Sequence, residues 1–264
     1  MQPVLLIGRL LMDQYLLIKE YPARGQDAVI RDAFETVGGC TYNAAATIKN
    51  LGGEALILSP INRDERGRRI LLELHTKGFR DDLLFEVDGA TTYCLVLLDD
   101  EGERTFLTYT GSQGDLIGPT SAAAINLRPT YVHLSGYSLV EIQHAGALFP
   151  LLQNLKQSGA KLLFDPGPLC REIEADVLKQ ILQLSDIFCP NNAELRVIEE
   201  HLNLDKDFFI SSGYLKNDRL VVIKEGARGV SAYSQTGRLF VPAFNVHSVD
   251  GTGAGDSFAG GLLF

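Results

Sequence analysis

Short apolar runs alternate with longer amphipathic segments along most of the chain. Runs of strand length occur at 4–7, 55–59, 131–134, 161–165, 187–189 and 220–224. Helical periodicity fills the segments 42–51, 64–77, 144–158, 172–184 and 194–201, and a further helix begins near Gly253. Strands that alternate with helices of about 10–15 residues predict βαβ units. We therefore expect an α/β fold with a mostly parallel central sheet and helices on both faces.

Two stretches, 13–37 and 91–109, break this rhythm because they are strand-like and lack a helical pattern. In the second stretch, the β-rich runs 93–98 and 105–109 flank an acidic turn that contains Gly102, which predicts a hairpin. We expect a small β-sheet lid built from segments at about 10–37 and 90–111. It would cover the carboxyl ends of the parallel strands, where open α/β sheets bind ligands. No repeat or linker divides the chain, so we interpret 1–264 as a single domain.

Composition narrows the class of protein. The chain has 264 residues, of which 45% are hydrophobic and 22% charged, and its formal net charge is −9. No basic stripe is present, which argues against nucleic acid or an anionic membrane as a partner. No apolar run has the length of a membrane span, and the N-terminus lacks the basic region of a signal peptide. Four widely spaced cysteines indicate reduced thiols in a cytoplasmic protein.

The sharpest local signal is the glycine-rich segment 249–261, which follows an apolar strand near 239–241 and opens a helix. Gly253 and Gly255 let the backbone approach a ligand closely. The first amides of a helix lack intrahelical partners and lie at its positive end, so Gly253, Ala254 and Gly255 form a predicted anion hole. Asp256 then lies beside the bound phosphate, where its carboxylate can take a proton from an attacking hydroxyl. The alternative is a tight turn in which Asp256 only stabilises the helix dipole.

Other interpretations of a glycine loop fail on spacing. A Walker A loop needs Gly-Lys-Ser/Thr, which does not occur, and a dinucleotide fingerprint belongs after the first strand. An EF-hand loop that began at Asp250 would need a glutamate where Gly261 stands.

Four motifs together resemble the ribokinase-like, or PfkB, carbohydrate and nucleoside kinases. The segment from Asp250 to Phe258 matches the family's C-terminal signature, except that Gly251 replaces a threonine. The N-terminal signature has its counterpart at 38–45, an Asn-x-x-Glu element at 191–194, and a strand with a Gly-x-x-Gly turn at 221–229. The four motifs occur in the family's order and cover nearly the whole chain.

This resemblance implies a three-layer α/β/α fold and ATP-dependent phosphorylation of a sugar hydroxyl, with Asp256 as the base. It implies substrate contacts from Asp13, Gly38, Gly39 and Asn43, to which we add Arg104 of the lid. The implied nucleotide-binding residues are Asn191, Lys224, Gly226, Gly229 and Thr252. Glu194 would organise Mg²⁺ through waters. Asp250 lies where the family often binds a monovalent cation such as K⁺, although Gly251 removes one hydroxyl from that loop.

Several of these residues also have purely structural interpretations. Asp13 can cap the first strand, and Asn43 can bond its own backbone at the start of a helix. Asn191 or Asn192 can serve as an N-cap, with Glu194 in the first helical turn. Lys224 can simply extend from a strand end into solvent.

The acceptor stays open among related classes. We favour a primary hydroxyl of an unphosphorylated sugar; convergent arginines would favour a phosphosugar or sugar acid, and an aromatic sandwich a nucleoside. A catalytically impaired sugar or nucleotide sensor is a further alternative, whereas an NAD-binding enzyme would need a fingerprint that 8–10 does not provide. Relatives of this type continue well beyond the motif and can dimerise through the lid. We therefore expect the given chain to be part of a longer protein, and a homodimer is compatible with the resemblance.

Overall fold

The computed structural model describes residues 3–111, 115–140, 142–211, 213–247 and 251–264. Within these residues, nine strands form a large sheet in the order β13-β12-β11-β10-β9-β8-β1-β4-β5. Their bounds are β1 Val4–Ile7, β4 Ala55–Asn62, β5 Leu84–Val87, β8 Tyr131–Ser135, β9 Lys161–Asp165, β10 Ile187–Phe188, β11 Leu220–Lys224, β12 Gly229–Ser234 and β13 Gly237–Pro242. All neighbours from β11 to β5 are parallel, and β12 and β13 add an antiparallel edge. The mostly parallel sheet is confirmed.

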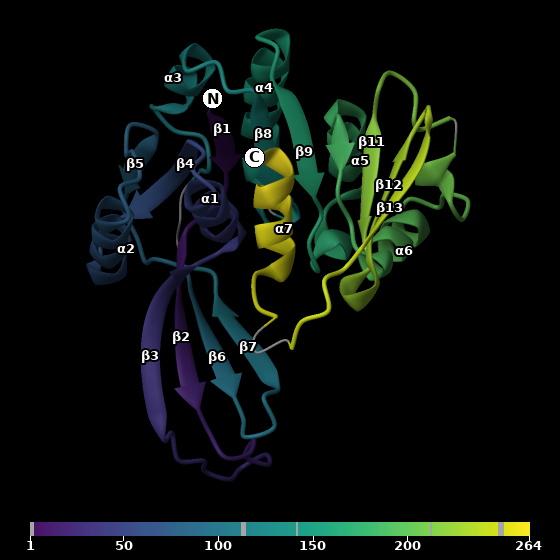
Figure 1. Cartoon of the computed structure of the whole chain (residues 1–264). Coiled ribbons are helices and arrows are strands. Elements are labelled where there is room, and N and C mark those ends of the chain that lie inside the picture. Colours follow the sequence, from purple (N-terminus) through teal and green to yellow (C-terminus); the bar gives the residue numbers. More distant parts are fainter. Residues whose placement is uncertain (1–2, 112–114, 141, 212, 248–250) are drawn as a thin grey trace.

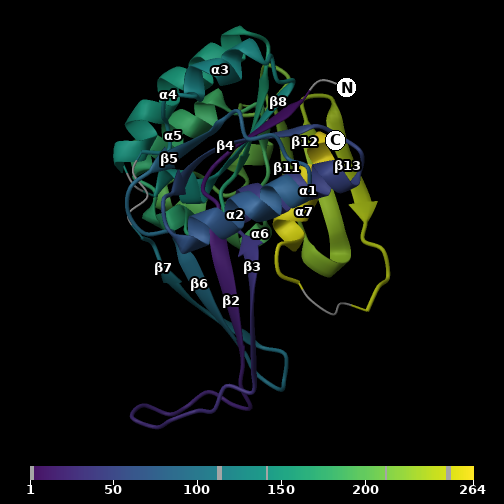
Figure 2. The same ribbon diagram turned by 90° about the vertical axis from the view of Figure 1, so that its left-hand side faces the viewer.

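Helices cover both faces of this sheet (Figure 2). One face carries α1 (Cys40–Asn50), α2 (Glu65–Thr76) and α7 (Ala254–Leu263). The other carries α3 (Ser121–Asn126), α4 (Ile142–Gln157), α5 (Ala175–Leu184) and α6 (Asn192–His201). Successive side chains of a strand point to opposite faces, so Leu5 and Ile7 of β1 pack against the second group and Val4 and Leu6 against the first. Strands that are apolar on both faces therefore build three layers.

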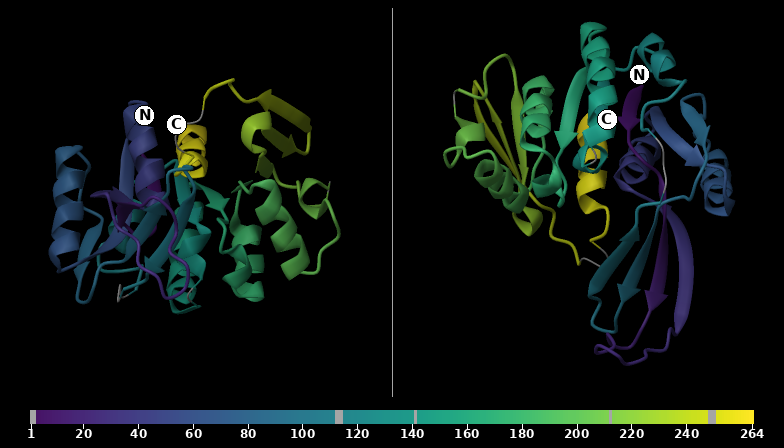
Figure 3. Two further views of the ribbon diagram at one scale, coloured as in Figure 1. Left: turned by 90° about the horizontal axis from the view of Figure 1, so that it is seen from below. Right: turned by 180° about the vertical axis from the view of Figure 1, so that it is seen from behind.

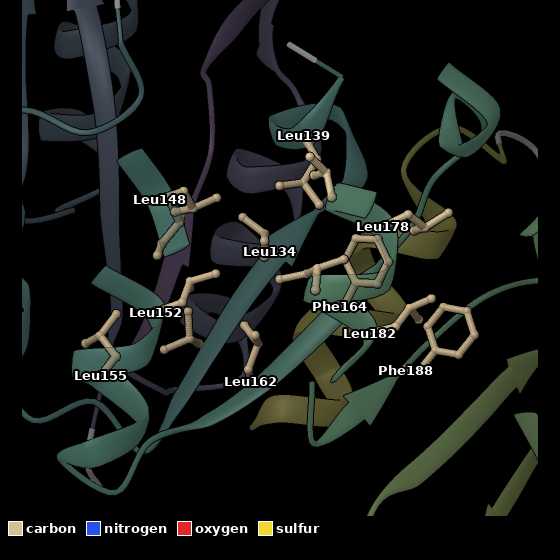
Figure 4. Close-up of a cluster of buried hydrophobic side chains, with 14 of the residues drawn as sticks. Leu134, Leu139, Leu148, Leu152, Leu155, Leu162, Phe164, Leu178, Leu182 and Phe188 are labelled. Atoms are coloured by element: carbon tan, nitrogen blue, oxygen red, sulfur yellow. The ribbon is translucent and has the colours of Figure 1, made fainter. Parts of the chain in front are cut away.

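The larger of the two cores lies between the sheet and helices α4 and α5. Figure 4 draws leucines of these helices around Phe164 of β9 and Leu134 of β8. Fully burying one such side chain contributes about 1.5–3 kcal/mol relative to leaving it exposed. This packing fixes the carboxyl ends of β8 and β9, at which polar residues follow.

A second, smaller sheet has the strand order β3-β2-β6-β7. Its strands are β2 (Leu11–Leu17), β3 (Asp32–Gly38), β6 (Tyr93–Leu98) and β7 (Arg104–Tyr109). The β6–β7 pair confirms the predicted hairpin. The small sheet projects from the end of the molecule at which α7 begins (Figure 1), below the half of the large sheet that carries β1, β4 and β5 (Figure 3).

Some predicted elements differ in detail. The helix expected at 172–184 begins only at Ala175, after a short 3-10 turn at Cys170–Glu172. Ile173 between them is extended and fully buried, so packing of its side chain interrupts the helical pattern. The sequence patterns did not indicate α3, β5 and β12. All four cysteines are free thiols, as predicted. No helix in the described part of the chain has the length and apolar character needed to cross a membrane.

Candidate active site

A cavity of about 380 Å³ lies at the carboxyl ends of the central strands. The ends of β8, β9 and β11 form its floor and one wall, and the first turns of α1, α6 and α7 complete it. The predicted site residues that line it are Asn191, Glu194, Lys224, Gly226, Gly253, Ala254, Gly255 and Asp256. Residues from distant parts of the sequence therefore meet where an open α/β sheet binds its ligand.

The first turn of α7 is shaped by glycine. Gly253 caps the helix with φ 70°, a left-handed conformation that a side chain would strain. A Cβ at Gly253 would lie 3.1 Å from Nδ2 of Asn43, and a Cβ at Gly255 would lie 3.5 Å from Nζ of Lys224. The Ala254 amide donates to the carbonyl of Gly251 at 3.2 Å. In this conformation, a predicted anion hole depends on the neighbouring amides of the turn rather than on that of Ala254.

Asp256 is held from the neighbouring helix. Nδ2 of Asn43 in α1 donates a hydrogen bond to Oδ2 of Asp256 at 2.8 Å. The two helices approach closely because Gly260 has no side chain: a Cβ there would lie 2.5 Å from the carbonyl oxygen of Ala44. The side chain of Asn43 thus reaches across to α7.

The opposite wall holds a buried ion pair. Nζ of Lys224 lies 2.9 Å from Oδ1 and 2.7 Å from Oδ2 of Asp165, and both side chains are largely shielded from solvent. Burial alone would lower the pKa of Lys224, but the Asp165 carboxylate outweighs it and raises that pKa. The lysine reaches the carboxylate of β9 over the end of β10, which is only two residues long. Lys224 is therefore a charged cavity residue rather than a solvated strand end.

Asn191 and Glu194 form a capping box at the start of α6. The Asn191 side chain accepts from the amides of Ala193 and Glu194, and Oε2 of Glu194 accepts from the Asn191 amide at 2.8 Å. The structural interpretation of this pair is confirmed, and both residues also line the cavity. Burial raises the pKa of the Glu194 carboxyl group.

The carboxyl groups of the cavity fit Mg²⁺ only if the ion is held mainly through water molecules. Among the described residues, no group of three or more His, Cys, Asp and Glu side chains is arranged to hold a metal ion. Magnesium keeps several waters and takes one or two protein carboxylates. Glu194, with one oxygen used by the cap, suits such a water-mediated contact.

Among the residues predicted to bind the substrate, the side chain of Asp13 lies directly against the backbone of Gly38. A Cβ at Gly38 would lie 1.9 Å from Oδ2 of Asp13, so only glycine fits beside this carboxyl group. Burial, and then the charge of Asp256, raise the pKa of Asp13 to about 6. Gly39 has φ 97° at the N-cap of α1, and a Cβ there would approach the carbonyl oxygen of Arg9 to 3.0 Å. The charges of Asp13 and Asp256 therefore interact, although Asp13 lies in β2 of the small sheet and Asp256 in helix α7.

Among the described residues, seven predicted site residues are not part of the cavity lining: Asp13, Gly38, Gly39 and Asn43, whose contacts are given above, and Arg104, Gly229 and Thr252. Arg104 pairs with Leu98 at the end of the β6–β7 hairpin, four residues beyond the level of Asp13. Gly229 has φ 117° and supports the turn into β12, and Thr252 is exposed before α7. Asp250 lies outside the described residues.

Sequence reasoning did not select Cys40, His133, Ser135 and Tyr137 as site residues, and gave Asp165 no catalytic role; all five line the cavity. His133 and Ser135 occupy alternate positions at the end of β8, so they share the face that α1 and α7 cover. Burial and the charge of Asp256 raise the pKa of the Cys40 thiol, which keeps it protonated. For Cys40, Ser135 and Asp165, the available signal was their place in the first turn of a helix or at the carboxyl end of a central strand.

Comparison with known families identifies the family of the chain. The family model described as the pfkB family of carbohydrate kinases matches residues 1–264. The chain belongs to this family. The pfkB family phosphorylates sugar hydroxyls, so this protein is a carbohydrate kinase.

Relatives of known name are similar over most of the chain. The ATP-dependent ribose-1-phosphate kinase of Halopiger xanaduensis is 27% identical over 262 residues, which cover 98% of this chain and 83% of that protein. Probable fructokinase-4 of Arabidopsis thaliana is 30% identical over 235 residues, 86% of this chain and 72% of that protein.

Solved structures share the pfkB kinase fold. The fructokinase of Xylella fastidiosa with bound ATP matches with a TM-score of 0.84 at 24% identity, over 99% of this chain and 80% of that chain. The inosine-bound nucleoside kinase of Burkholderia thailandensis matches with a TM-score of 0.77 at 18% identity, over 98% and 81%. The predicted three-layer ribokinase-like fold with its small sheet is confirmed.

Proposed function

We propose that this pfkB kinase transfers the γ-phosphoryl group of ATP to a hydroxyl of a neutral, unphosphorylated sugar, with Asp256 as the general base. The observation that carries the proposal is the contact between Asn43 and Asp256, which holds a carboxyl group at the N-terminus of α7 beside the glycine turn. A base and an anion-binding turn then face one cavity.

The proton path in this proposal is short. The acceptor hydroxyl gives its proton to a carboxyl oxygen of Asp256 while its oxygen attacks the phosphorus. Helix-end amides and Lys224 offset the charge on the moving phosphoryl group, and they act strongly because the cavity is partly shielded from water. Asn43 holds the carboxyl group in place by a bond to one oxygen, which leaves the other to face the hydroxyl.

Nucleotide and metal would occupy the side of the cavity formed by β11 and α6. Gly226 and Lys224 are placed to hold phosphate oxygens, and Glu194 to contact Mg²⁺ through a water. When bound, Mg²⁺ neutralises phosphate charge and orients the phosphoryl group.

The charges of the cavity favour a neutral acceptor. Its lining carries the carboxyl groups of Asp165, Glu194 and Asp256, and Asp13 stands nearby. Lys224 is the one Lys or Arg side chain among the described lining residues, and it is already paired with Asp165. The phosphate of a phosphosugar or the carboxylate of a sugar acid would meet no arginine among the described lining residues. The hydroxyls of a neutral sugar would instead meet carboxylates that accept their hydrogen bonds.

We further propose that the small sheet acts as a lid and as a dimer surface. It carries Asp13 towards the cavity, and it exposes large apolar side chains at Phe34, Phe106, Leu107 and Tyr109. Apolar residues gathered on one small sheet are a usual mark of an interaction surface. Analytical ultracentrifugation tests the dimer: a monomer at micromolar concentration would contradict it.

The test of the kinase proposal is an ADP-release assay with sugars, sugar phosphates, sugar acids and nucleosides. We expect a neutral sugar to be the best acceptor and Asp256→Asn to lose turnover by at least about 10²-fold, as for removal of a general base. Asp176→Asn on the exposed side of α5 is the matched control and should keep wild-type rates. Wild-type turnover in Asp256→Asn would contradict the assigned base, and preference for an anionic acceptor would contradict the assigned substrate class.

A further inference from the structure

His133 occupies the floor of the cavity and has no role in the reaction as proposed so far. It is the third residue of β8 and is only 1% exposed. Its neighbours in register are Leu6 of β1 and Leu163 of β9, which belong to the apolar cluster under α1 and α7. The imidazole ring therefore lies beneath the two helices that carry Asn43 and Asp256, and it contributes to the cavity lining.

This ring is a polar group in an apolar setting. Neither Nδ1 nor Nε2 has a hydrogen-bond partner among the residues that the structure describes. Native proteins leave few buried polar groups unpaired, because each loses its hydrogen bonds to water on burial. Leucine would fill a similar space between Leu6 and Leu163 without this loss. Packing alone does not explain an imidazole at this position. The polar ring atoms that it brings to the cavity point to a role in the site.

The ring is neutral in this environment. Burial lowers the pKa of His133 to about 4; the charge of Asp256 opposes this shift and that of Lys224 reinforces it. A neutral imidazole carries one N–H donor and one nitrogen acceptor. It can donate to an oxygen above it without adding a positive charge, so Asp256 remains free to act as a base.

We propose that His133 is a positioning residue for Asp256. Its neutral ring is the polar floor beneath the first turn of α7. Neither ring nitrogen is bonded to Asp256 in the free protein. When the acceptor is bound, one hydroxyl in the cavity links the ring to the carboxyl group of Asp256 and holds that group in the orientation that receives the acceptor's proton. The inference rests on the proposed role of Asp256. It adds a second support below the carboxyl group, while Asn43 supports it from the side.

The deciding variant is His133→Leu in the full chain. We expect kcat to fall about tenfold, the effect of losing one hydrogen bond to a charged group, with KM for sugar and ATP within about twofold of wild type. The melting temperature should stay equal or rise by about 2 °C or more, because an unpaired polar group is replaced by an apolar one. His133→Gln and His133→Asn place a donor near Nε2 and Nδ1, respectively, and one of them should recover most of the loss.

His201→Leu is the matched control. His201 lies in α6, and its Nε2 contacts the carbonyl oxygen of Ile173 at 2.8 Å, so its substitution should lower the melting temperature and leave kcat unchanged. A His133→Leu variant with kcat within twofold of wild type would overturn the proposal. A loss of kcat that comes with a lower melting temperature, or without recovery by Gln or Asn, would also overturn it. Activity in Asp256→Asn separately tests the base, so the two failures are distinguishable.

Discussion

Two walls of the cavity each present an aspartate, but they hold it in different ways. On the α7 wall, Asp256 accepts a hydrogen bond from the neutral amide of Asn43. On the strand wall, Asp165 accepts two bonds from the ammonium group of Lys224. Burial raises the pKa of the Asp165 carboxyl group, and the ammonium group of Lys224 opposes this shift. Both oxygens of Asp165 lie within hydrogen-bond distance of Lys224, whereas Asn43 contacts only one oxygen of Asp256. The comparison supports our proposal that Asp256, rather than Asp165, receives the acceptor's proton.

Removing the cation of the strand wall should have the largest effect. Lys224→Met leaves the buried carboxyl group of Asp165 without its partner, which should lower the free energy of unfolding by about 3 kcal/mol. Urea denaturation measures this loss. The double variant Lys224→Met/Asp165→Asn should recover most of it, because no buried charge remains.

The control for that substitution is Lys179→Met. Lys179 forms an exposed pair with Asp176 on α5, and its removal should change the unfolding free energy by at most about 0.5 kcal/mol. Equal losses in the two single variants would contradict a special role for the buried pair.

The second-largest effect is expected when a carboxyl group replaces the amide of Asn43 beside Asp256. Asn43→Asp brings a second carboxyl group to the place from which the amide now contacts Asp256 at 2.8 Å. Two carboxyl groups this close raise the pKa of one of them, so the pair holds a proton at neutral pH and the base is weakened. Turnover at pH 7 should fall about tenfold and recover partly as the pH rises. A pH–rate profile parallel to that of the wild type would show that Asn43 does not control Asp256.

Much of the fold was predictable because its signals are local. The glycine motif, the hairpin turn near Gly102 and the apolar runs each lie within a few residues, and strands with helices between them leave few topologies. The cavity lining was predictable where a motif carried it, as at Asp256 and Glu194. Arg104 shows the limit: its charge suggested substrate contact, but its place at the far end of β7 depends on strand register.

The remaining site residues depend on contacts between distant segments. Lys224 and Asp165 are 59 residues apart, and they meet because β10 between them is short. Asn43 and Asp256 are 213 residues apart and meet because Gly260 lets α1 and α7 pack closely. His133 has the sequence surroundings of an ordinary core strand position. No pattern in the sequence distinguishes it from its apolar neighbours.

A side chain at Gly38 tests the proposed sugar contact of Asp13, which the small sheet carries. In Gly38→Ala, the added Cβ would lie 1.9 Å from Oδ2 of Asp13, so the carboxyl group must move away. KM for the sugar should rise about fivefold, with a smaller change in kcat, since a ground-state contact is lost. Gly146→Ala, in α4 with open space around it, is the matched control and should leave KM unchanged. Equal KM values in both variants would contradict sugar binding by Asp13.

The pH dependence of Asp13 gives the smallest expected effect. Its pKa of about 6 in the folded protein lies above the ordinary value of 3.8, so the folded state binds the proton more tightly than the unfolded state. The unfolding free energy should therefore rise as the pH falls from 7 to 4, by about 1 kcal/mol because partial exposure weakens the effect. Asp13→Asn should show a smaller rise, and the remainder comes from Asp165, Glu194 and Glu199, whose pKa values burial also raises. Over the same range the wild-type KM for the sugar should increase below pH 6, because a protonated carboxyl group accepts hydrogen bonds less well. Stability and sugar binding thus change in opposite directions, and a parallel change would show that another group titrates.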